Sequence, residues 1–177
     1  MVVSPTHRWV KINIDGALNV QDKLSGVGVV IRDWRGGHLV ARGTTIPRRY
    51  IGTNFGAVFS EMAQQQGFQQ VVVESDCLKA IATLNWTHSD LSAIGTIADD
   101  VLQLASTFPM VRFIHVSRLC NGVAHLLAKF ALSSSNNLVW FEEPPILVQE
   151  LLFQDMCNSF LFKSFYSKTC VTLYEFD

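Results

Sequence analysis

A chain of 177 residues that is 49% hydrophobic and 16% charged has the composition of one globular domain with a sizeable core. The formal net charge of -1 provides no overall attraction to nucleic acid, so a partner of that kind would have to be recognised at a local site. Four cysteines lie far apart and form no C-x-x-C pair, which argues against a zinc site and against a dense disulfide framework.

Membrane and export signals are not evident in the sequence. No segment reaches the roughly 20 consecutive apolar residues that a membrane helix needs. The first residues, MVVSPTHRWVK, lack the apolar region of a signal peptide. We therefore expect a soluble, monomeric intracellular protein of the nucleus or cytoplasm, with no membrane partner.

Three strands are predicted at the start of the chain. Residues 9–14, WVKINI, alternate apolar and polar side chains, which indicates a strand with one buried face. Residues 27–33 and 38–45 follow, joined by WRGG, whose glycines suit a tight turn. The second and third strands are therefore expected to pair as an antiparallel hairpin.

Helices and strands are predicted to alternate after this hairpin. Residues 69–76, QQVVVESD, form an apolar run bounded by polar residues, which is typical of a central strand covered on both faces. Another strand is expected at residues 110–116. Helices are expected at residues 55–66, 77–85, 91–106 and 122–132. This order predicts an α/β domain with a five-stranded mixed sheet, made of three N-terminal strands and two parallel strands and flanked by helices.

The C-terminal part is expected to lie outside the main domain. A polar segment, SSSNN at residues 133–137, is typical of a boundary. We assign residues 9–133 to the domain and residues 134–157 to a strap that packs on it. Residues 158–177 show no clear period, and we expect this tail to be poorly ordered.

Two aspartates, Asp15 and Asp76, follow predicted strands that can lie parallel and adjacent. Ligands of such sheets bind outside the carboxyl ends of the strands. Paired carboxylates resist ionisation unless a cation offsets their charge, and Mg²⁺ binds through one or two carboxylates while keeping waters for a phosphate substrate. Two such ions about 4 Å apart can clamp both oxygens of a phosphodiester displacement. Taken singly, an Asp-Gly pair such as Asp15-Gly16 is more often a turn, and an aspartate in the place of Asp76 is more often a helix N-cap.

Several sequence blocks resemble one known family in their order and spacing. They are KINIDGA, GVGVVIRDWRGG, GFQQVVVESDCLKAI, VRFIHVSRLCNGVAHLLAKFAL and WFEEPP, within residues 9–145. These blocks are similar to the type 1 ribonuclease H domains of plants, akin to those at the ends of non-LTR retrotransposon reverse transcriptases. The resemblance implies a ribonuclease H-like fold and an endonuclease that cuts the RNA strand of RNA–DNA hybrids. It also implies Mg²⁺ as the cofactor, with Mn²⁺ as an alternative.

The resemblance also assigns site residues. Asp15 and Asp76 match the first and third acids of a metal-binding quartet, and His115 matches a histidine that helps to bring in water or release product. The fourth acid falls at His125, whose imidazole is a poorer Mg²⁺ ligand than an oxygen. An ordinary polar residue on a helix face is the alternative interpretation of His125. Asn121, in the same block, is expected to be mainly the N-cap of the following helix.

The second acid of the quartet is missing. It is expected around residues 51–53, which are Ile51, Gly52 and Thr53. Glu61 is the only acid between Asp33 and Glu74, and it lies too near Asp76 for the family spacing. Glu74 shares a strand face with Asp76, so a supporting role for it stays open. Because each lost anion weakens the binding of a hard cation, we expect weak or absent cleavage.

Candidate contacts with a nucleic acid are few. Arg48 and Arg49, before the expected first helix, and Lys79, just after Asp76, are candidates for phosphate contacts, and the resemblance adds Asn121 as a candidate for nucleic-acid binding. Two alternatives to a nuclease remain. One is a catalytically dead nucleic-acid-binding domain, and the other is a non-enzymatic interaction module or a decayed retrotransposon-derived product.

Overall fold

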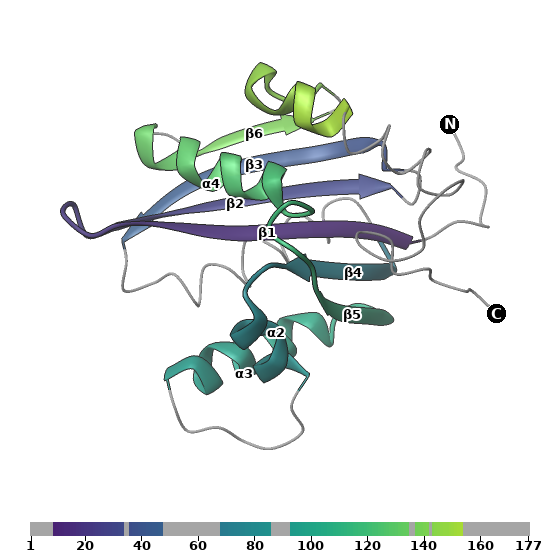
Figure 1. The fold of residues 1–177 in the computed structure, drawn as a ribbon. Coiled ribbons are helices and arrows are strands. Elements are labelled where there is room, and N and C mark those ends of the chain that lie inside the picture. The colour runs from purple at the N-terminus through teal and green to yellow at the C-terminus, as the bar shows by residue number, and fades with distance from the viewer. Residues whose placement is uncertain are drawn as a thin grey trace.

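The computed structural model describes residues 9–33, 36–47, 68–85, 93–134, 137–141 and 143–153. Within these residues the chain forms one mixed sheet with the strand order β5-β4-β1-β2-β3-β6 (Figure 1). The strands are β1 (Trp9–Asn19), β2 (Leu24–Asp33), β3 (His38–Pro47), β4 (Gln70–Ser75), β5 (Met110–His115) and β6 (Leu138–Phe141). The labelled helices are α2 (Leu78–Leu84), α3 (Ala93–Ala105) and α4 (Gly122–Ser133).

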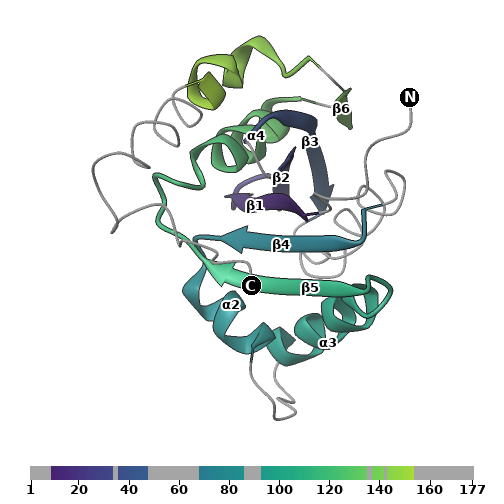
Figure 2. The ribbon, with the colours of Figure 1, turned by 90° about the vertical axis from the view of Figure 1, so that its right-hand side faces the viewer.

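The helices lie in two separate places relative to the sheet. Helix α4 packs on β1, β2 and β3, whereas α2 contacts α3 and β5. Figure 2 shows α4 and the α2–α3 pair on opposite sides of the sheet, with the pair beside β5. Strand β4 lies between β1 and β5 and is parallel to both, and its residues from Val71 to Ser75 are buried. The prediction of a central parallel strand is therefore confirmed.

All five expected strands are present, and the expected α/β fold class is confirmed. The described part adds a sixth strand, β6, which pairs antiparallel with the edge of β3. Trp140 of β6 lies beside Phe130 of α4, with 6.3 Å between the ring centroids. Residues 146–153 are helical, and Val148 and Leu152 from this segment are buried against α4 and the sheet. The segment predicted to be a strap thus supplies both a strand and a helix.

Strand β1 is longer than predicted, and this changes the position of Asp15. Parallel pairing with β4 ends at Asn13, which is opposite Glu74. Antiparallel pairing with β2 continues, with Asp15 opposite Gly28 and Asn19 opposite Leu24. The expectation that Asp15 lies at a strand end is therefore wrong. Asp15 lies within β1, at the point where this strand has lost its neighbour on one side.

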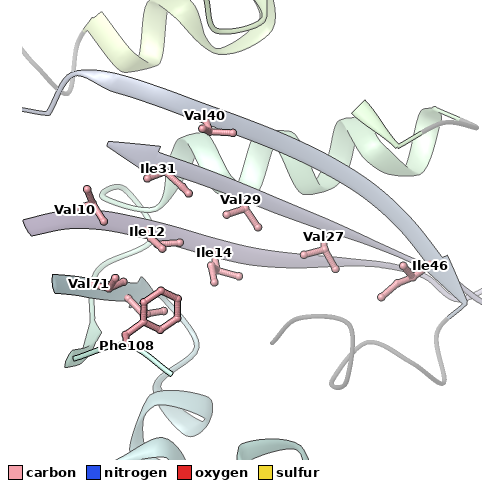
Figure 3. Close-up of a cluster of buried hydrophobic side chains, with 11 residues drawn as sticks. Val10, Ile12, Ile14, Val27, Val29, Ile31, Val40, Ile46, Val71 and Phe108 are labelled. Atoms are coloured by element: carbon pink, nitrogen blue, oxygen red, sulfur yellow. The ribbon is translucent and has the colours of Figure 1, made fainter. Parts of the chain in front are cut away.

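Alternation along β1 separates a hydrophobic face from a polar face. Val10, Ile12 and Ile14 point into a cluster that also contains residues of β2, β3 and β4 (Figure 3). Lys11, Asn13 and Asp15 point to the other side, because successive side chains of a strand alternate. The sequence WVKINID therefore both builds a core and presents polar side chains on the face that α4 covers.

Two glycines of β2 allow α4 to lie directly on the strand. A Cβ atom at Gly26 would collide with the carbonyl oxygen of Ala128, and one at Gly28 would collide with the carbonyl oxygen of Ala124. Because both obstacles are helix backbone, neither can be moved by a simple side-chain rotation. The close approach sets the height of the first turns of α4 above β1 and β2.

Replacing Gly28 with Ala is expected to destabilise the fold by about 2 kcal/mol, because a well-packed interface must open to admit a methyl group. The measurement is urea unfolding followed by circular dichroism. Gly122→Ala is the control, since a Cβ atom there has nothing within 4 Å. Equal stability of Gly28→Ala and Gly122→Ala would contradict this close packing.

His38 gives the fold a dependence on pH. Burial lowers the pKa of His38 below its ordinary value of 6.5, and the charge of Arg32 lowers it further. Both ring nitrogens are buried without a hydrogen-bond partner among the described residues. The unfolded chain therefore takes up the proton more readily than the folded one, so stability is lost as pH falls below about 6.5.

We expect the free energy of unfolding to fall between about pH 7 and pH 5, and to fall less in His38→Phe, which has no ring proton to gain. Urea unfolding at a series of pH values measures both slopes. Identical slopes for the two proteins would exclude His38 as the cause.

Some predicted features fall outside the described residues. These are the helix expected at 55–66, the tail at 158–177, and the residues Arg48, Arg49 and Glu61. Among the residues that the structure does describe, no helix is long and apolar enough to cross a membrane.

Candidate active site

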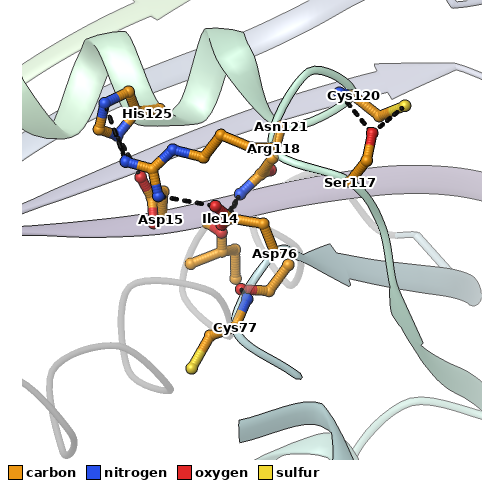
Figure 4. A network of polar contacts seen from close by, with 10 residues as sticks. Ile14, Asp15, Asp76, Cys77, Ser117, Arg118, Cys120, Asn121 and His125 are labelled. Atoms are coloured by element: carbon orange, nitrogen blue, oxygen red, sulfur yellow. Dashed lines mark hydrogen bonds and ion pairs between the residues drawn. The ribbon is translucent and has the colours of Figure 1, made fainter. Parts of the chain in front are cut away.

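Asp15 and Asp76 come together beside the first turns of α4. Asp15 lies on β1, and Asp76 directly follows the last residue of β4. Because Asn13 is opposite Glu74 in the parallel register, the two aspartates lie two positions further along neighbouring chains. Figure 4 shows both carboxylates facing the turn before α4 and the side chain of His125. Each is mostly buried, with side chains 9% exposed.

Asn121 connects the two strands that carry the aspartates. Its Nδ2 donates to the backbone oxygen of Ile14 at 2.9 Å and to Oδ1 of Asp76 at 2.8 Å. The side chain is fully buried. Asn121 does occupy the N-cap position of α4, as predicted, but its side chain makes no capping hydrogen bond. Its expected main role as a cap is therefore wrong, because the side chain is used to fix the end of β4 beside β1.

Arg118 lies between the two halves of the site. Its Nη1 forms an ion pair with Oδ2 of Asp76 at 2.7 Å, and its Nη2 is 2.8 Å from Nδ1 and 3.0 Å from Nε2 of His125. The sequence analysis missed Arg118. The available signal was its place in SRLCN, three residues before Asn121, which puts both side chains on one turn.

His125 completes a chain of contacts to the other carboxylate. Its Nδ1 is 2.6 Å from Oδ2 of Asp15. A neutral imidazole with its proton on Nδ1 satisfies both neighbours, because Nδ1 then donates to Asp15 and Nε2 accepts from Arg118. His125 is thus part of the aspartate network, and the alternative of an ordinary residue on a helix face does not describe it.

The two aspartates have different proton affinities. Burial raises the pKa of Asp15, and the nearby charge of Asp76 adds to this, while the hydrogen bond from His125 opposes it. Burial also acts to raise the pKa of Asp76, but hydrogen bonds from Arg118 and Asn121 outweigh it and lower this pKa. The environments therefore favour an anionic Asp76 and make Asp15 the easier group to protonate.

Glu74 belongs to a different network on the same face of the sheet. Its Oε1 pairs with Nζ of Lys11 at 2.9 Å, and its Oε2 accepts from Nδ2 of Asn13 at 2.9 Å. Nη2 of Arg32 in turn donates to Oδ1 of Asn13 at 2.6 Å. Glu74 is thus held by Lys11 and Asn13, and no described contact joins it to Asp15 or Asp76.

Two of the predicted site residues lie outside this cluster. His115 ends β5, is exposed, and stands opposite Ser75 of β4, so a strand separates it from Asp15. Among the described contacts, none joins His115 or the exposed Lys79 to either aspartate.

The described residues do not fit a preassembled two-metal centre. Among them, no group of three or more His, Cys, Asp or Glu side chains is placed to hold a metal ion. Arg118 instead offsets the charge of Asp76, and His125 contacts one oxygen of Asp15. Oδ1 of Asn121 is buried and has no hydrogen-bond partner among the described residues. An amide oxygen of this kind can be a ligand of a hard cation. It carries no charge, so the donor set remains short of anions.

Comparisons with known proteins agree with this architecture. A family described as Reverse transcriptase-like matches residues 13–131. A relative from Arabidopsis thaliana that bears the name of a ribonuclease H protein is 31% identical over 166 residues, covering 89% of this chain and 26% of that protein. The chain thus spans about a quarter of that relative's length.

Solved structures show the same fold. RNase H1 from the archaeon Halobacterium salinarum has a TM-score of 0.62 and 23% identity, with 71% of this chain and 98% of that chain covered. LC11-RNase H1 in complex with an RNA/DNA hybrid has a TM-score of 0.60 and 19% identity, with 70% and 96% covered. The family match covers most of the sheet, α4 and both aspartates. The chain therefore belongs to the Reverse transcriptase-like family and has the ribonuclease H-like fold.

Proposed function

We propose that this chain binds RNA–DNA hybrids and hydrolyses their RNA strand weakly, as an impaired endonuclease of the ribonuclease H type. The observation that carries the proposal is the convergence of Asp15 and Asp76 on neighbouring strands. The family membership supports it, and so does the similarity in fold to a protein whose structure was solved with an RNA/DNA hybrid. We propose Mg²⁺ as the cofactor, with Mn²⁺ as an alternative.

The proposed impairment follows from the charge of the site. Among the described residues two carboxylates lie together here, which is little negative charge for a pair of divalent ions. Arg118 already offsets the charge of Asp76, and His125 contacts Asp15. Residues 51–53, where the resemblance puts the missing acid, contain no carboxylate. Cleavage is therefore expected to be slow even where the hybrid binds well.

Binding would rest mainly on phosphate contacts, and the RNA strand would be distinguished by its 2′-hydroxyl groups. Arg118 and Lys79 are exposed cationic side chains near Asp76. Arg118 contacts its carboxylate, and Lys79 follows it three residues later in the sequence. We propose both as phosphate contacts, together with Arg48 and Arg49. His115, exposed at the end of β5, remains a proposed contact for product or water.

The proposal is tested by fluorescence anisotropy, which measures the affinity for a labelled hybrid in EDTA. The affinity for double-stranded DNA of the same sequence is measured for comparison. We expect the hybrid to bind more tightly, with affinity that falls steeply as salt rises, because each phosphate contact releases counterions. Lys79→Gln should reduce the salt dependence, whereas Lys23→Gln, in the distant β1–β2 turn, should not. Absence of hybrid binding at about 50 mM salt would contradict the proposal.

A nucleic-acid-binding domain without catalysis is the second candidate. The contacts of Arg118 with Asp76 and of His125 with Asp15 favour it, because they occupy oxygens of the only carboxylates that the described residues bring together there. Hybrid binding of normal salt dependence, with no cleavage above that of Asp76→Asn, would identify this case.

A further inference from the structure

We infer that Arg118 is a built-in counterion of the Asp15–Asp76 pair and competes with divalent cations for it. The observation is the continuous chain of contacts Asp76–Arg118–His125–Asp15, which spans the space between the two carboxylates (Figure 4). The inference rests on the proposed function in one respect: it takes a divalent ion as the competitor of Arg118 for the two carboxylates.

The contacts occupy the atoms that a bridging ion would need. Oδ2 of Asp76 is bound by Nη1 of Arg118 at 2.7 Å, and Oδ2 of Asp15 is bound by Nδ1 of His125 at 2.6 Å. A cation between these oxygens would lie next to the guanidinium, so the two positive charges would repel each other. The ion and the Arg118 contact therefore exclude one another.

Arg118 is placed so that it can leave without disturbing the site. Its side chain is 58% exposed, and an exposed charge pair contributes little to stability. The turn that carries it is closed by backbone hydrogen bonds from Cys120 and Asn121 to the carbonyl oxygen of Ser117. Asp76 is held separately, because Asn121 donates to its other oxygen, Oδ1. Movement of Arg118 toward solvent would free Oδ2 of Asp76 while the carboxylate keeps its position.

A purely structural role for Arg118 makes the opposite prediction. If its contacts with Asp76 and His125 were needed to assemble the site, removing the guanidinium would loosen both carboxylates and weaken ion binding. If Arg118 competes, its removal leaves an uncompensated pair of carboxylates, and ion binding becomes tighter. The direction of the change in affinity therefore separates the two roles.

The test is titration calorimetry with MnCl₂ alone on the full chain. Arg118→Gln keeps a polar but shorter side chain and removes the charge, and we expect it to bind Mn²⁺ about tenfold more tightly than the wild type. Arg118→Lys keeps the charge and should lie between the two. Lys129→Gln removes a positive charge from the exposed face of α4 and should match the wild type. Asp76→Asn in the Arg118→Gln background should abolish the gain.

Equal or weaker Mn²⁺ binding by Arg118→Gln would overturn the inference, as would a gain that survives Asp76→Asn. Thermal melting without metal verifies that each variant is folded. Because the titration contains no nucleic acid, its failure leaves the hybrid-binding measurement in EDTA unaffected, and the two proposals can fail separately.

Discussion

Replacing Lys11 with Met is expected to destabilise the fold by about 2 kcal/mol, because it leaves a buried carboxylate without its ion-pair partner. Glu74 has a side chain that is 6% exposed, and Lys11, which is 33% exposed, lies 2.9 Å from it. Among the described residues, the other donor to Glu74 is the amide of Asn13, which is neutral. The effect is measured as the change in the free energy of unfolding in urea.

A second substitution isolates the cause. Glu74→Gln removes the charge but keeps an oxygen for Asn13, so the double variant Lys11→Met/Glu74→Gln should recover most of the lost stability. Lys129→Met is the control, since Lys129 is exposed and makes no described contact with a carboxylate, and it should remain within about 0.5 kcal/mol of the wild type. A Lys11→Met protein as stable as this control would show that the pair is unimportant.

Removal of the Asn121 side chain is expected to cost about 3 kcal/mol of stability. Asn121→Ala deletes the hydrogen bonds to Ile14 and Asp76 and leaves a buried backbone carbonyl without its donor. It also takes away a connection between β1 and the end of β4. The loss should therefore appear both in unfolding free energy and in weaker Mn²⁺ binding, because Asp76 loses one of its supports.

Asn85 provides a matched control for this prediction. Its Nδ2 also donates to a backbone carbonyl, that of Phe113, at 3.0 Å, but at an exposed position. Asn85→Ala should therefore lose about 1 kcal/mol or less. If Asn121→Ala and Asn85→Ala were equally stable, the buried amide of Asn121 would not be what joins the two strands.

Much of the fold could be predicted from the sequence because its signals are local. Alternation in WVKINI and the apolar run in QQVVVESD each indicate a strand from consecutive residues. Strand β6 could not be recognised in this way. It is an edge strand of four residues, and its pairing with β3 depends on a partner about a hundred positions earlier in the chain.

The site shows the same division between local and long-range signals. Asp15 and Asp76 could be paired in advance because parallel neighbouring strands bring corresponding positions side by side, even though Asp15 lies within β1 and not at its end. Arg118 could not be assigned to the site in advance. An exposed arginine in a turn is usually solvated, and only the packing of α4 on β1 and β2 brings this one to Asp76. Asn121 was expected to cap α4 because that is a local role, whereas its actual partners lie on β1 and after β4.

We propose that Asp15 and Asp76 act as one pair on a nucleic-acid phosphodiester. The most direct measurement is single-turnover cleavage of an end-labelled RNA–DNA hybrid in Mn²⁺, with the wild type beside Asp15→Asn and Asp76→Asn. We expect slow cleavage of the RNA strand by the wild type and none by either variant. Cleavage that persists undiminished in both variants would contradict it.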